Sequence, residues 1–200
     1  MVDTGLTPRG RIRAAVAALI ALCTLLQVAG LAPLMRYDRG AIAAGELWRL
    51  VTGHLVHLGP MHLALNAAGL VLVAALVGNR LGVGAWGVVF LTTALTISGG
   101  LWLAAPRLTW YVGLSGVLHG LLVAGAVRAA QDVRERWFAL AVLLVVALKL
   151  AWEQAVGSMP ATAALAGGRV VVDAHLYGAL GGLAAMGLLA AAAAIRPGRR

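Results

Sequence analysis

Long runs of hydrophobic residues alternate with short polar connections along the whole chain. A membrane-spanning helix needs about 20 apolar residues at a rise of about 1.5 Å each, and six runs approach or reach that length. The pattern therefore predicts six transmembrane helices, at residues 14–34, 62–77, 84–104, 115–127, 137–156 and 174–195. The second and fourth are short because polar residues and glycines occupy their first turns. We expect both to lie inside the bundle.

The composition agrees with this class. Hydrophobic residues make up 62% of the 200 positions and charged residues 12%, which is too few to cover an ordinary soluble core with a polar surface. We therefore expect an all-α, polytopic membrane protein with a single membrane domain over residues 1–200. The single cysteine, Cys23, lies inside the first predicted span, so an internal disulfide is excluded.

The net charge of +9 is compatible with nucleic-acid binding, but the arginines follow a membrane pattern instead. Ten of the fifteen lie before the first span, in the second and fourth connections and after the last span: Arg9, Arg11, Arg13, Arg80, Arg128, Arg134, Arg136, Arg196, Arg199 and Arg200. The other five lie in the alternate connections: Arg36, Arg39, Arg49, Arg107 and Arg169. The positive-inside rule then places both termini in the cytoplasm. Residues 1–13 become a cytoplasmic segment, 35–61 an extracytoplasmic loop and 196–200 a basic cytoplasmic tail, and nucleic acid is not an expected partner.

Two segments allow more than one interpretation. The basic N-terminal residues followed by an apolar run also resemble a secretory signal peptide, although the run has the length of a full span. Lys149 lies four residues before Glu153 within the fifth predicted span. These two residues form either an intrahelical ion pair, which lowers the cost of burying both charges, or part of a transport path.

A serine flanked by small residues opens the fourth predicted span, in Gly113-Leu114-Ser115-Gly116. Polar residues in a membrane interior are costly to keep and are therefore candidates for function. A helix N-terminus also exposes free N–H groups and the positive end of the helix dipole, which favour negative charge beside the serine oxygen. The alternative is a structural N-cap serine.

His175 lies at the start of the sixth predicted span, within a ladder of small residues. Ala174, Gly178 and Gly182 recur every four residues, and the fourth span carries a matching ladder at Gly116, Gly120 and Ala124. Such ladders let two helices touch backbone to backbone, and facing them brings Ser115 and His175 together. An imidazole within hydrogen-bond reach makes a serine nucleophilic. Asp173 points elsewhere on a helix, so we expect a dyad.

Pro60 predicts the start of the second span, because proline is favoured in a first helical turn. His62 and Asn66 then lie one turn apart on the same face. They provide either two donors for a developing oxyanion or polar links between helices. In the preceding loop, Trp48 and Arg49 suit the membrane interface, where tryptophan lies at headgroup level and arginine reaches toward phosphate.

These motifs together resemble the rhomboid intramembrane serine proteases, and most closely the rhombosortase branch. The resemblance covers nearly the whole chain. It rests on Trp48-Arg49 with Thr52, His57 with His62 and Asn66, Gly113-Leu114-Ser115-Gly116, and Ala174-His175 followed by Gly178. It implies a six-helix rhomboid-like bundle without cofactor or metal, in which Ser115 is the nucleophile and His175 the general base. By the same resemblance His62, Asn66 and the Ser115 backbone N–H form the oxyanion hole.

His119 stands where rhomboids commonly carry a tyrosine, four residues after the serine. We consider three roles for it: stacking on His175, orienting a water, or competing as base. The substitution resembles the rhombosortase pattern, which implies processing of proteins that bear a C-terminal Gly-Gly, a hydrophobic helix and a basic tail. It also implies a multi-pass protein of the bacterial inner membrane with its site facing the periplasm, and with membrane lipid and transmembrane proteins as partners.

Three other functions fit parts of this pattern. A general rhomboid protease would cleave other single-span substrates. A non-catalytic rhomboid-like scaffold would bind transmembrane helices, but it would not need both Ser115 and His175. A haem or metal carrier would use the five histidines: His54, His57, His62, His119 and His175. Metal ligands generally have supporting carboxylates, and only Asp173 and Glu46 lie near these histidines in the sequence.

Overall fold

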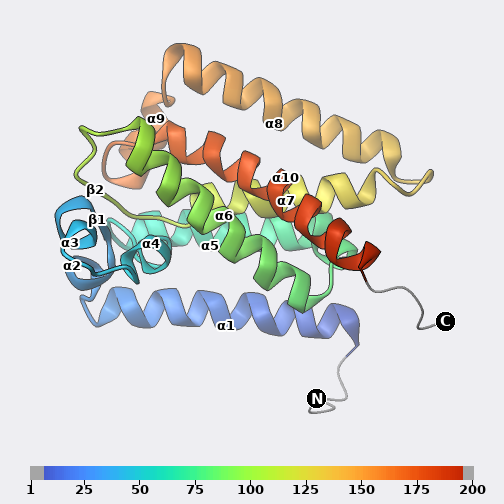
Figure 1. Ribbon diagram of the computed structural model, residues 1–200, viewed down its shortest axis with the longest axis horizontal. Coiled ribbons are helices and arrows are strands. Elements are labelled where there is room, and N and C mark those ends of the chain that lie inside the picture. The colour runs from blue at the N-terminus through green and yellow to red at the C-terminus, as the bar shows by residue number, and fades with distance from the viewer. Residues whose placement is uncertain (1–6, 196–200) are drawn as a thin grey trace.

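The computed structural model describes residues 7–195, so residues 1–6 and the predicted tail at 196–200 lie outside the described part of the chain. Its elements in chain order are α1 (Pro8–Val28), α2 (Ala32–Met35), β1 (Tyr37–Asp38), α3 (Arg39–Ala43), α4 (Arg49–Thr52), α5 (Pro60–Val77), the 3-10 turn η1 (Gly78–Arg80), α6 (Val83–Ala104), β2 (Trp110–Tyr111), α7 (Ser115–Ala129), α8 (Arg136–Val156), α9 (Pro160–Ala166) and α10 (Val172–Ala194). Figure 1 shows the long helices side by side, with α2, α3, α4 and the two short strands gathered at one end.

Within the described residues, five helices are long and apolar enough to cross a membrane: α1, α5 with η1, α6, α8 and α10. The helix at the fourth predicted span, α7, is a shorter apolar helix of 15 residues. Val145 and Leu148, in the middle of α8, are 66% and 62% exposed. Many other large apolar side chains are also exposed. Such an outer surface is favourable where lipid covers it. The chain is therefore a multi-pass helical membrane protein.

The predicted first span is displaced from the helix that the structure contains. α1 begins at Pro8 rather than at residue 14 and ends at Val28, because the Thr7 side chain accepts a hydrogen bond from the backbone N–H of Gly10 at 3.1 Å and proline suits the first turn. Beyond the helix, Gly30 adopts a positive φ of 66° that ends the helical path. The three N-terminal arginines thus lie in the first turns of α1. The other five predicted spans agree with the helices to within two residues.

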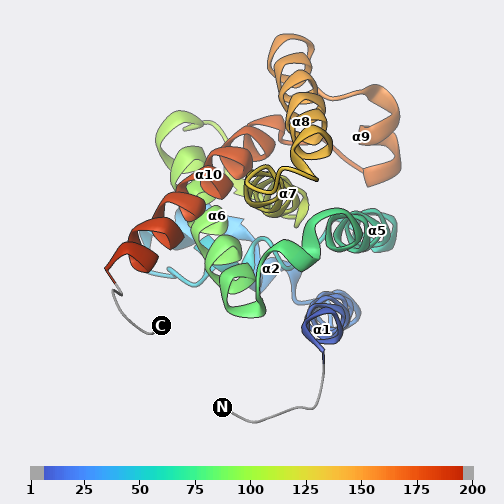
Figure 2. The ribbon, with the colours of Figure 1, turned by 90° about the vertical axis from the view of Figure 1, so that its right-hand side faces the viewer.

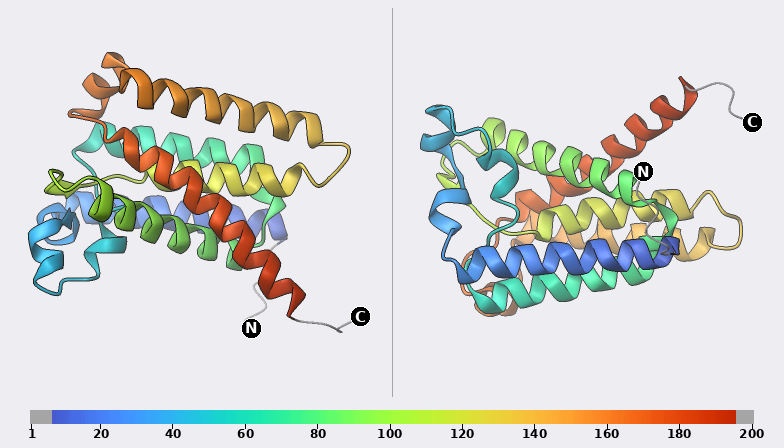
Figure 3. Two further views of the ribbon diagram at one scale, coloured as in Figure 1. Left: turned by 45° about the horizontal axis from the view of Figure 1, so that its top comes forward. Right: turned by 90° about the horizontal axis from the view of Figure 1, so that it is seen from below.

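α7 lies in the middle of the bundle, surrounded by α5, α6, α8 and α10 (Figure 2), and most of its residues are buried. The expected interior position of the fourth span is thus confirmed. The same expectation was wrong for the second span, because α5 packs beside α1 at the periphery (Figure 3) and exposes Leu65, Val71 and Leu72. Only the first turns of α5 carry polar groups toward a cavity. The apolar run of this span is therefore short because its first turns line that cavity, and not because the whole helix is interior.

Small residues let α7 and α10 touch backbone to backbone, as their spacing predicts. A Cβ atom built on Gly116 would lie 2.6 Å from the carbonyl oxygen of Ala174. A Cβ on Gly178 would overlap the carbonyl of Gly116, and one on Gly182 would overlap the carbonyl of Gly120. The two helices run in the same direction and start at the same end of the bundle (Figure 1). Their first turns are therefore neighbours.

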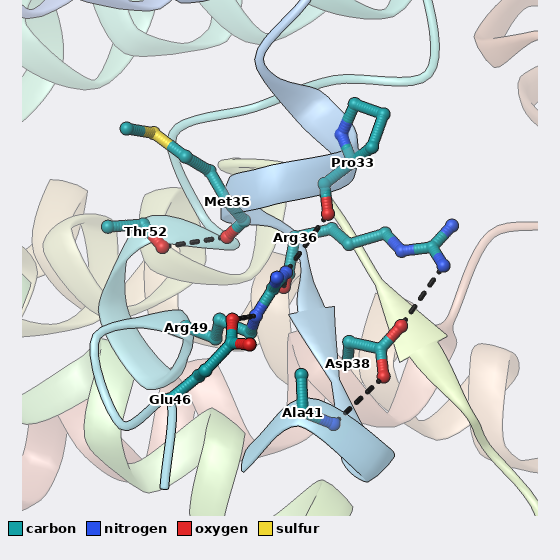
Figure 4. Close-up of polar contacts among 8 residues, drawn as sticks. All are labelled: Pro33, Met35, Arg36, Asp38, Ala41, Glu46, Arg49 and Thr52. Atoms are coloured by element: carbon teal, nitrogen blue, oxygen red, sulfur yellow. Dashed lines mark hydrogen bonds and ion pairs between the residues drawn. The ribbon is translucent and has the colours of Figure 1, made fainter. Parts of the chain in front are cut away.

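The connection between α1 and α5 folds into a compact unit at this same end. β1 pairs with β2 in the antiparallel sense, with Tyr37 opposite Tyr111. The Thr52 hydroxyl donates to the carbonyl oxygen of Met35 at 2.7 Å (Figure 4), which ties α4 to the end of α2. The hydropathy pattern does not predict the strand pair, because two-residue strands leave no period to detect.

Arg49 holds this connection together from inside. It is buried, its Nε donates to Glu46 at 2.6 Å, and its Nη1 donates to the carbonyl oxygens of Pro33 and Arg36, both at 3.0 Å (Figure 4). The expectation that Arg49 reaches toward lipid phosphate is therefore wrong. Its Nη1 binds backbone carbonyl oxygens in and directly after α2. Trp48 is more than half exposed, as an interfacial residue would be.

The arginine-rich connections occupy the opposite end of the bundle. The turns after α5 and after α7 lie at the end where α1 begins and α10 stops (Figure 1), and an ion pair between Arg80 and Glu135 links these two turns. The alternate connections that carry most of the arginines thus lie at the same end of the bundle. That this end faces the cytoplasm stays a prediction from the charge count.

Candidate active site

A cavity of about 650 Å³ lies at the end of the bundle where α7 and α10 begin. This volume falls in the range of about 300–1,000 Å³ typical of ligand pockets. Its wall is formed by α5, α7, α8, α9 and α10 and by the segment before α7. Five of the predicted site residues line it: His62, Asn66, Ser115, His119 and His175.

Ser115 and His175 meet in this wall. Ser115 is the first residue of α7, and His175 lies in the first turn of α10. The Ser115 Oγ lies 3.0 Å from the Nε2 of His175, within hydrogen-bond distance. The N-cap position of α7 is occupied by Leu114, so the interpretation of Ser115 as an N-cap is wrong. The backbone contact between α7 and α10 is what keeps these two first turns together.

His175 makes a second polar contact, with Glu153 near the end of α8. Its Nδ1 lies 2.9 Å from Oε2 of Glu153, and both side chains are less than a tenth exposed. An ionised carboxylate only accepts hydrogen bonds, so Nδ1 carries the proton and Nε2 presents its lone pair to the Ser115 hydroxyl. Sequence reasoning considered only Asp173 as a carboxylate partner for His175 and did not identify this contact with Glu153.

Lys149 completes the polar group on α8. Its Nζ donates to Oε1 of Glu153 at 2.7 Å, which confirms the predicted intrahelical ion pair. The same Nζ lies 3.4 Å from Nδ1 of His175. Because both atoms are donors when Nδ1 is protonated, this second contact is not a hydrogen bond in that tautomer. Each oxygen of Glu153 thus takes one donor.

His62 and Asn66 present polar groups to the cavity from α5. The backbone N–H of Leu58 donates to Nδ1 of His62 at 3.3 Å, so the proton of the neutral ring resides on Nε2, which is a donor. This ring packs against Gly113, where φ is 122° and a built Cβ would lie 3.0 Å from Nε2. Only glycine suits that position. Asn66 donates one amide hydrogen to the carbonyl of His62 at 2.9 Å and keeps a second.

His119 lies directly against the ring of His175. The two imidazole centroids are 4.4 Å apart and the rings are nearly parallel, at 20°. Nδ1 of His119 lies 2.8 Å from the carbonyl oxygen of Ser115. A carbonyl only accepts, so this nitrogen is the donor and Nε2 is left with a lone pair. Of the three roles considered for His119, the structure shows the stacking contact, and the other two stay predictions.

The remaining predicted supporting residues lie away from the cavity. His57 is buried and meets His62 edge-on, with ring centroids 5.2 Å apart. Burial first, and the neighbouring His62 second, lowers the pKa of His57 to about 4, so this ring is neutral at pH 7. Neither of its nitrogens has a partner among residues 7–195. Trp48 and Arg49 also lie outside the cavity wall.

Two cavity residues were missed as site residues by sequence reasoning, although one signal was available. Glu153 and Lys149 both line the cavity. Successive spans alternate in direction, so the last turn of the fifth span lies at the same end as the first turns of the fourth and sixth. A carboxylate one turn before the end of the fifth span is therefore level with Ser115 and His175.

Fold and site together define a class: a multi-pass helical membrane protein with a serine and a histidine in hydrogen-bond contact in the wall of a cavity. Comparison with known proteins gives the family. The Rhomboid domain matches residues 44–192, and the chain belongs to the rhomboid family. It is 33% identical over 85 residues to the "Putative rhomboid protease YdcA" of Bacillus subtilis (strain 168), and this match covers 42% of each chain. The chain thus spans less than half the length of that relative.

Proposed function

We propose that this protein is an intramembrane serine endopeptidase with Ser115 as nucleophile and His175 as general base. The observation that carries the proposal is the 3.0 Å contact between Oγ and Nε2 in a cavity wall, in a chain of a family known for intramembrane proteolysis. A serine hydroxyl is a weak nucleophile until an adjacent base accepts its proton. The neighbouring imidazole supplies that base, and the reaction needs no cofactor.

The reaction follows from the positions of these groups. Oγ of Ser115 attacks the scissile carbonyl carbon while its proton moves to Nε2 of His175. The Nε2–H of His62, the second amide hydrogen of Asn66 and the free N–H at the start of α7 stabilise the oxyanion. The imidazolium then gives its proton to the leaving amine nitrogen as the C–N bond breaks. Water resolves the acyl enzyme, unless a sorting reaction supplies another nucleophile.

The substrates we assign are membrane-anchored proteins with a C-terminal Gly-Gly, a hydrophobic helix and a basic tail, as in the rhombosortase branch. His119 in place of the usual tyrosine supports this assignment. A helix hides its peptide bonds in hydrogen bonds, and glycine is the residue at which helical structure is weakest. By the charge count, the cavity opens on the extracytoplasmic side of the membrane, which the resemblance to rhombosortases implies is the bacterial inner membrane.

The test is labelling of the detergent-solubilised full chain with a fluorophosphonate probe. We expect the native chain to be labelled and Ser115→Ala and His175→Ala to lose labelling. Labelling that persists in either variant, or a native chain that is not labelled, overturns the proposal. The second outcome would favour the helix-binding scaffold.

A second arm tests the substrate class. Co-expressed single-span reporters carry either the Gly-Gly, helix and basic tail, or the same tail with Gly-Gly replaced by Val-Val. Selective cleavage of the first supports the rhombosortase assignment. Equal cleavage of both indicates a general rhomboid protease.

A further inference from the structure

We infer that Glu153 is the positioning residue of this site and that it completes a chain of three side chains, one from each of α7, α10 and α8. This inference rests on the proposed function and deepens it. The serine and histidine come from helices joined by small-residue ladders. The carboxylate comes from a third helix, and its role is to hold His175 in the tautomer that can accept the serine proton.

The contacts of Glu153 support this role. Oε2 lies 2.9 Å from Nδ1 of His175, whose Nε2 lies 3.0 Å from Oγ of Ser115. The Glu153 side chain is 9% exposed, whereas that of Lys149 is 38% exposed. A pair that only stabilised α8 would need one oxygen of Glu153 for Lys149, and it would not account for the contact of the second oxygen with an imidazole on another helix.

Packing one turn away holds the carboxylate in place. An apolar cluster of Val123 on α7, Val146 and Leu150 on α8, and Ala179 on α10 joins the three helices. Leu150 precedes Glu153 by one helical turn. The packing of α8 against α7 and α10 in this cluster thus fixes the position of the carboxylate relative to the other two side chains.

The donors around Glu153 are matched to its two oxygens. Lys149 donates to Oε1 and Nδ1–H of His175 donates to Oε2. Among residues 7–195, the Ser115 hydroxyl and the stacked ring of His119 also contact the His175 ring. Without a second acceptor oxygen, the ammonium group 3.4 Å from Nδ1 would donate to that nitrogen. The ring proton would then lie on Nε2, and Nε2 could not accept the proton of Ser115.

The change Glu153→Gln removes the second acceptor oxygen. Its amide has one oxygen for two donors, and its NH₂ group can only donate. In a serine–histidine–carboxylate site, the equivalent change to an amide keeps the geometry and lowers turnover about 10⁴-fold, because the tautomer is wrong. In fluorophosphonate labelling, kinact is the rate constant of covalent reaction at saturating probe and KI the probe concentration that gives half of this rate. We expect Glu153→Gln to lower kinact by about 10²- to 10⁴-fold with KI nearly unchanged.

Two further variants separate positioning from a structural role. In Glu153→Gln with Lys149→Met, the ammonium no longer competes for the remaining oxygen, so the single amide oxygen of the new side chain can accept Nδ1–H of His175. We expect kinact of this double variant to be at least tenfold higher than kinact of Glu153→Gln alone. The matched control is Glu46→Gln, which removes a carboxylate from an ion pair with Arg49 outside the cavity. It should lower thermal stability without changing kinact.

A measurement that does not depend on activity reads the tautomer directly. The ¹⁵N spectrum of histidine-labelled protein, with the His175 signals assigned by their loss in His175→Ala, should show a protonated Nδ1 in the native chain and loss of that form in Glu153→Gln. Native labelling kinetics in Glu153→Gln overturn the inference. So does a double variant as slow as the single one, or an unchanged ¹⁵N spectrum. A protonated Nδ1 in a native chain that the probe does not label would instead reject only the proposed function.

Discussion

The contact between α7 and α10 gives a quantitative prediction for Gly178→Ala. A Cβ at this position overlaps the carbonyl oxygen of Gly116, and because both partners are backbone, no side-chain rotation relieves the overlap. An ordinary carbon–oxygen contact is about 3.3–3.6 Å, so the helices must separate by roughly 1 Å. Ser115 and His175, now 3.0 Å apart, would then lie about 4 Å apart, beyond hydrogen-bond distance.

The expected effects differ in size between stability and activity. Overpacking costs about 1–3 kcal/mol, and the better helix propensity of alanine offsets about 1 kcal/mol of it. A displacement of about 1 Å between reacting groups costs about 10²-fold in rate. We therefore expect Gly178→Ala to lower kinact for fluorophosphonate labelling about 100-fold, with a modest loss in the free energy of unfolding.

The assay compares this variant with Gly187→Ala on the same helix. Nothing lies within 4 Å of a Cβ built on Gly187, so this control has the same change in helix propensity without the overlap. Labelling kinetics and unfolding by sodium dodecyl sulfate, followed by circular dichroism in detergent, are measured for both. If Gly178→Ala labels and unfolds like Gly187→Ala, the backbone contact does not position the two side chains and the reasoning fails.

Three other predictions use different parts of the molecule. His62→Ala and Asn66→Ala should each lower kinact by about 10²- to 10³-fold with unchanged unfolding; native kinetics would remove that residue from the oxyanion site. The pKa of His57, near 4 when folded against 6.5, means that the unfolded chain binds the proton first as pH falls. Stability should therefore drop by up to about 3 kcal/mol between pH 6.5 and pH 4, and thermal unfolding of His57→Leu should show a flatter profile; an equally steep one contradicts this. Arg39→Met should cost about 2–3 kcal/mol, because its guanidinium binds carbonyl oxygens at the end of α6. The same cost for Arg36→Met, whose side chain is 36% exposed, would refute a specific role for Arg39.

Much of this architecture is readable in the sequence because the membrane imposes it. Backbone polar groups in lipid must be satisfied within each helix, so apolar runs mark the spans, and five of the six predicted ones match to within two residues. The ladders at Gly116 and Gly178 were equally readable, because close helix contact in lipid requires small residues at four-residue spacing. Pro60 marked the start of α5 through the same local chemistry.

Only the tertiary structure decided the contacts between distant segments that no sequence pattern marks. Arg49 reads as an interfacial residue until its carbonyl partners, 13 and 16 residues away along the chain, are known. α5 looked interior because hydropathy does not distinguish a cavity wall from a buried face. Glu153 looked like half of an ion pair, since spacing along one helix reveals the partner on that helix but not the imidazole that another helix brings to its second oxygen.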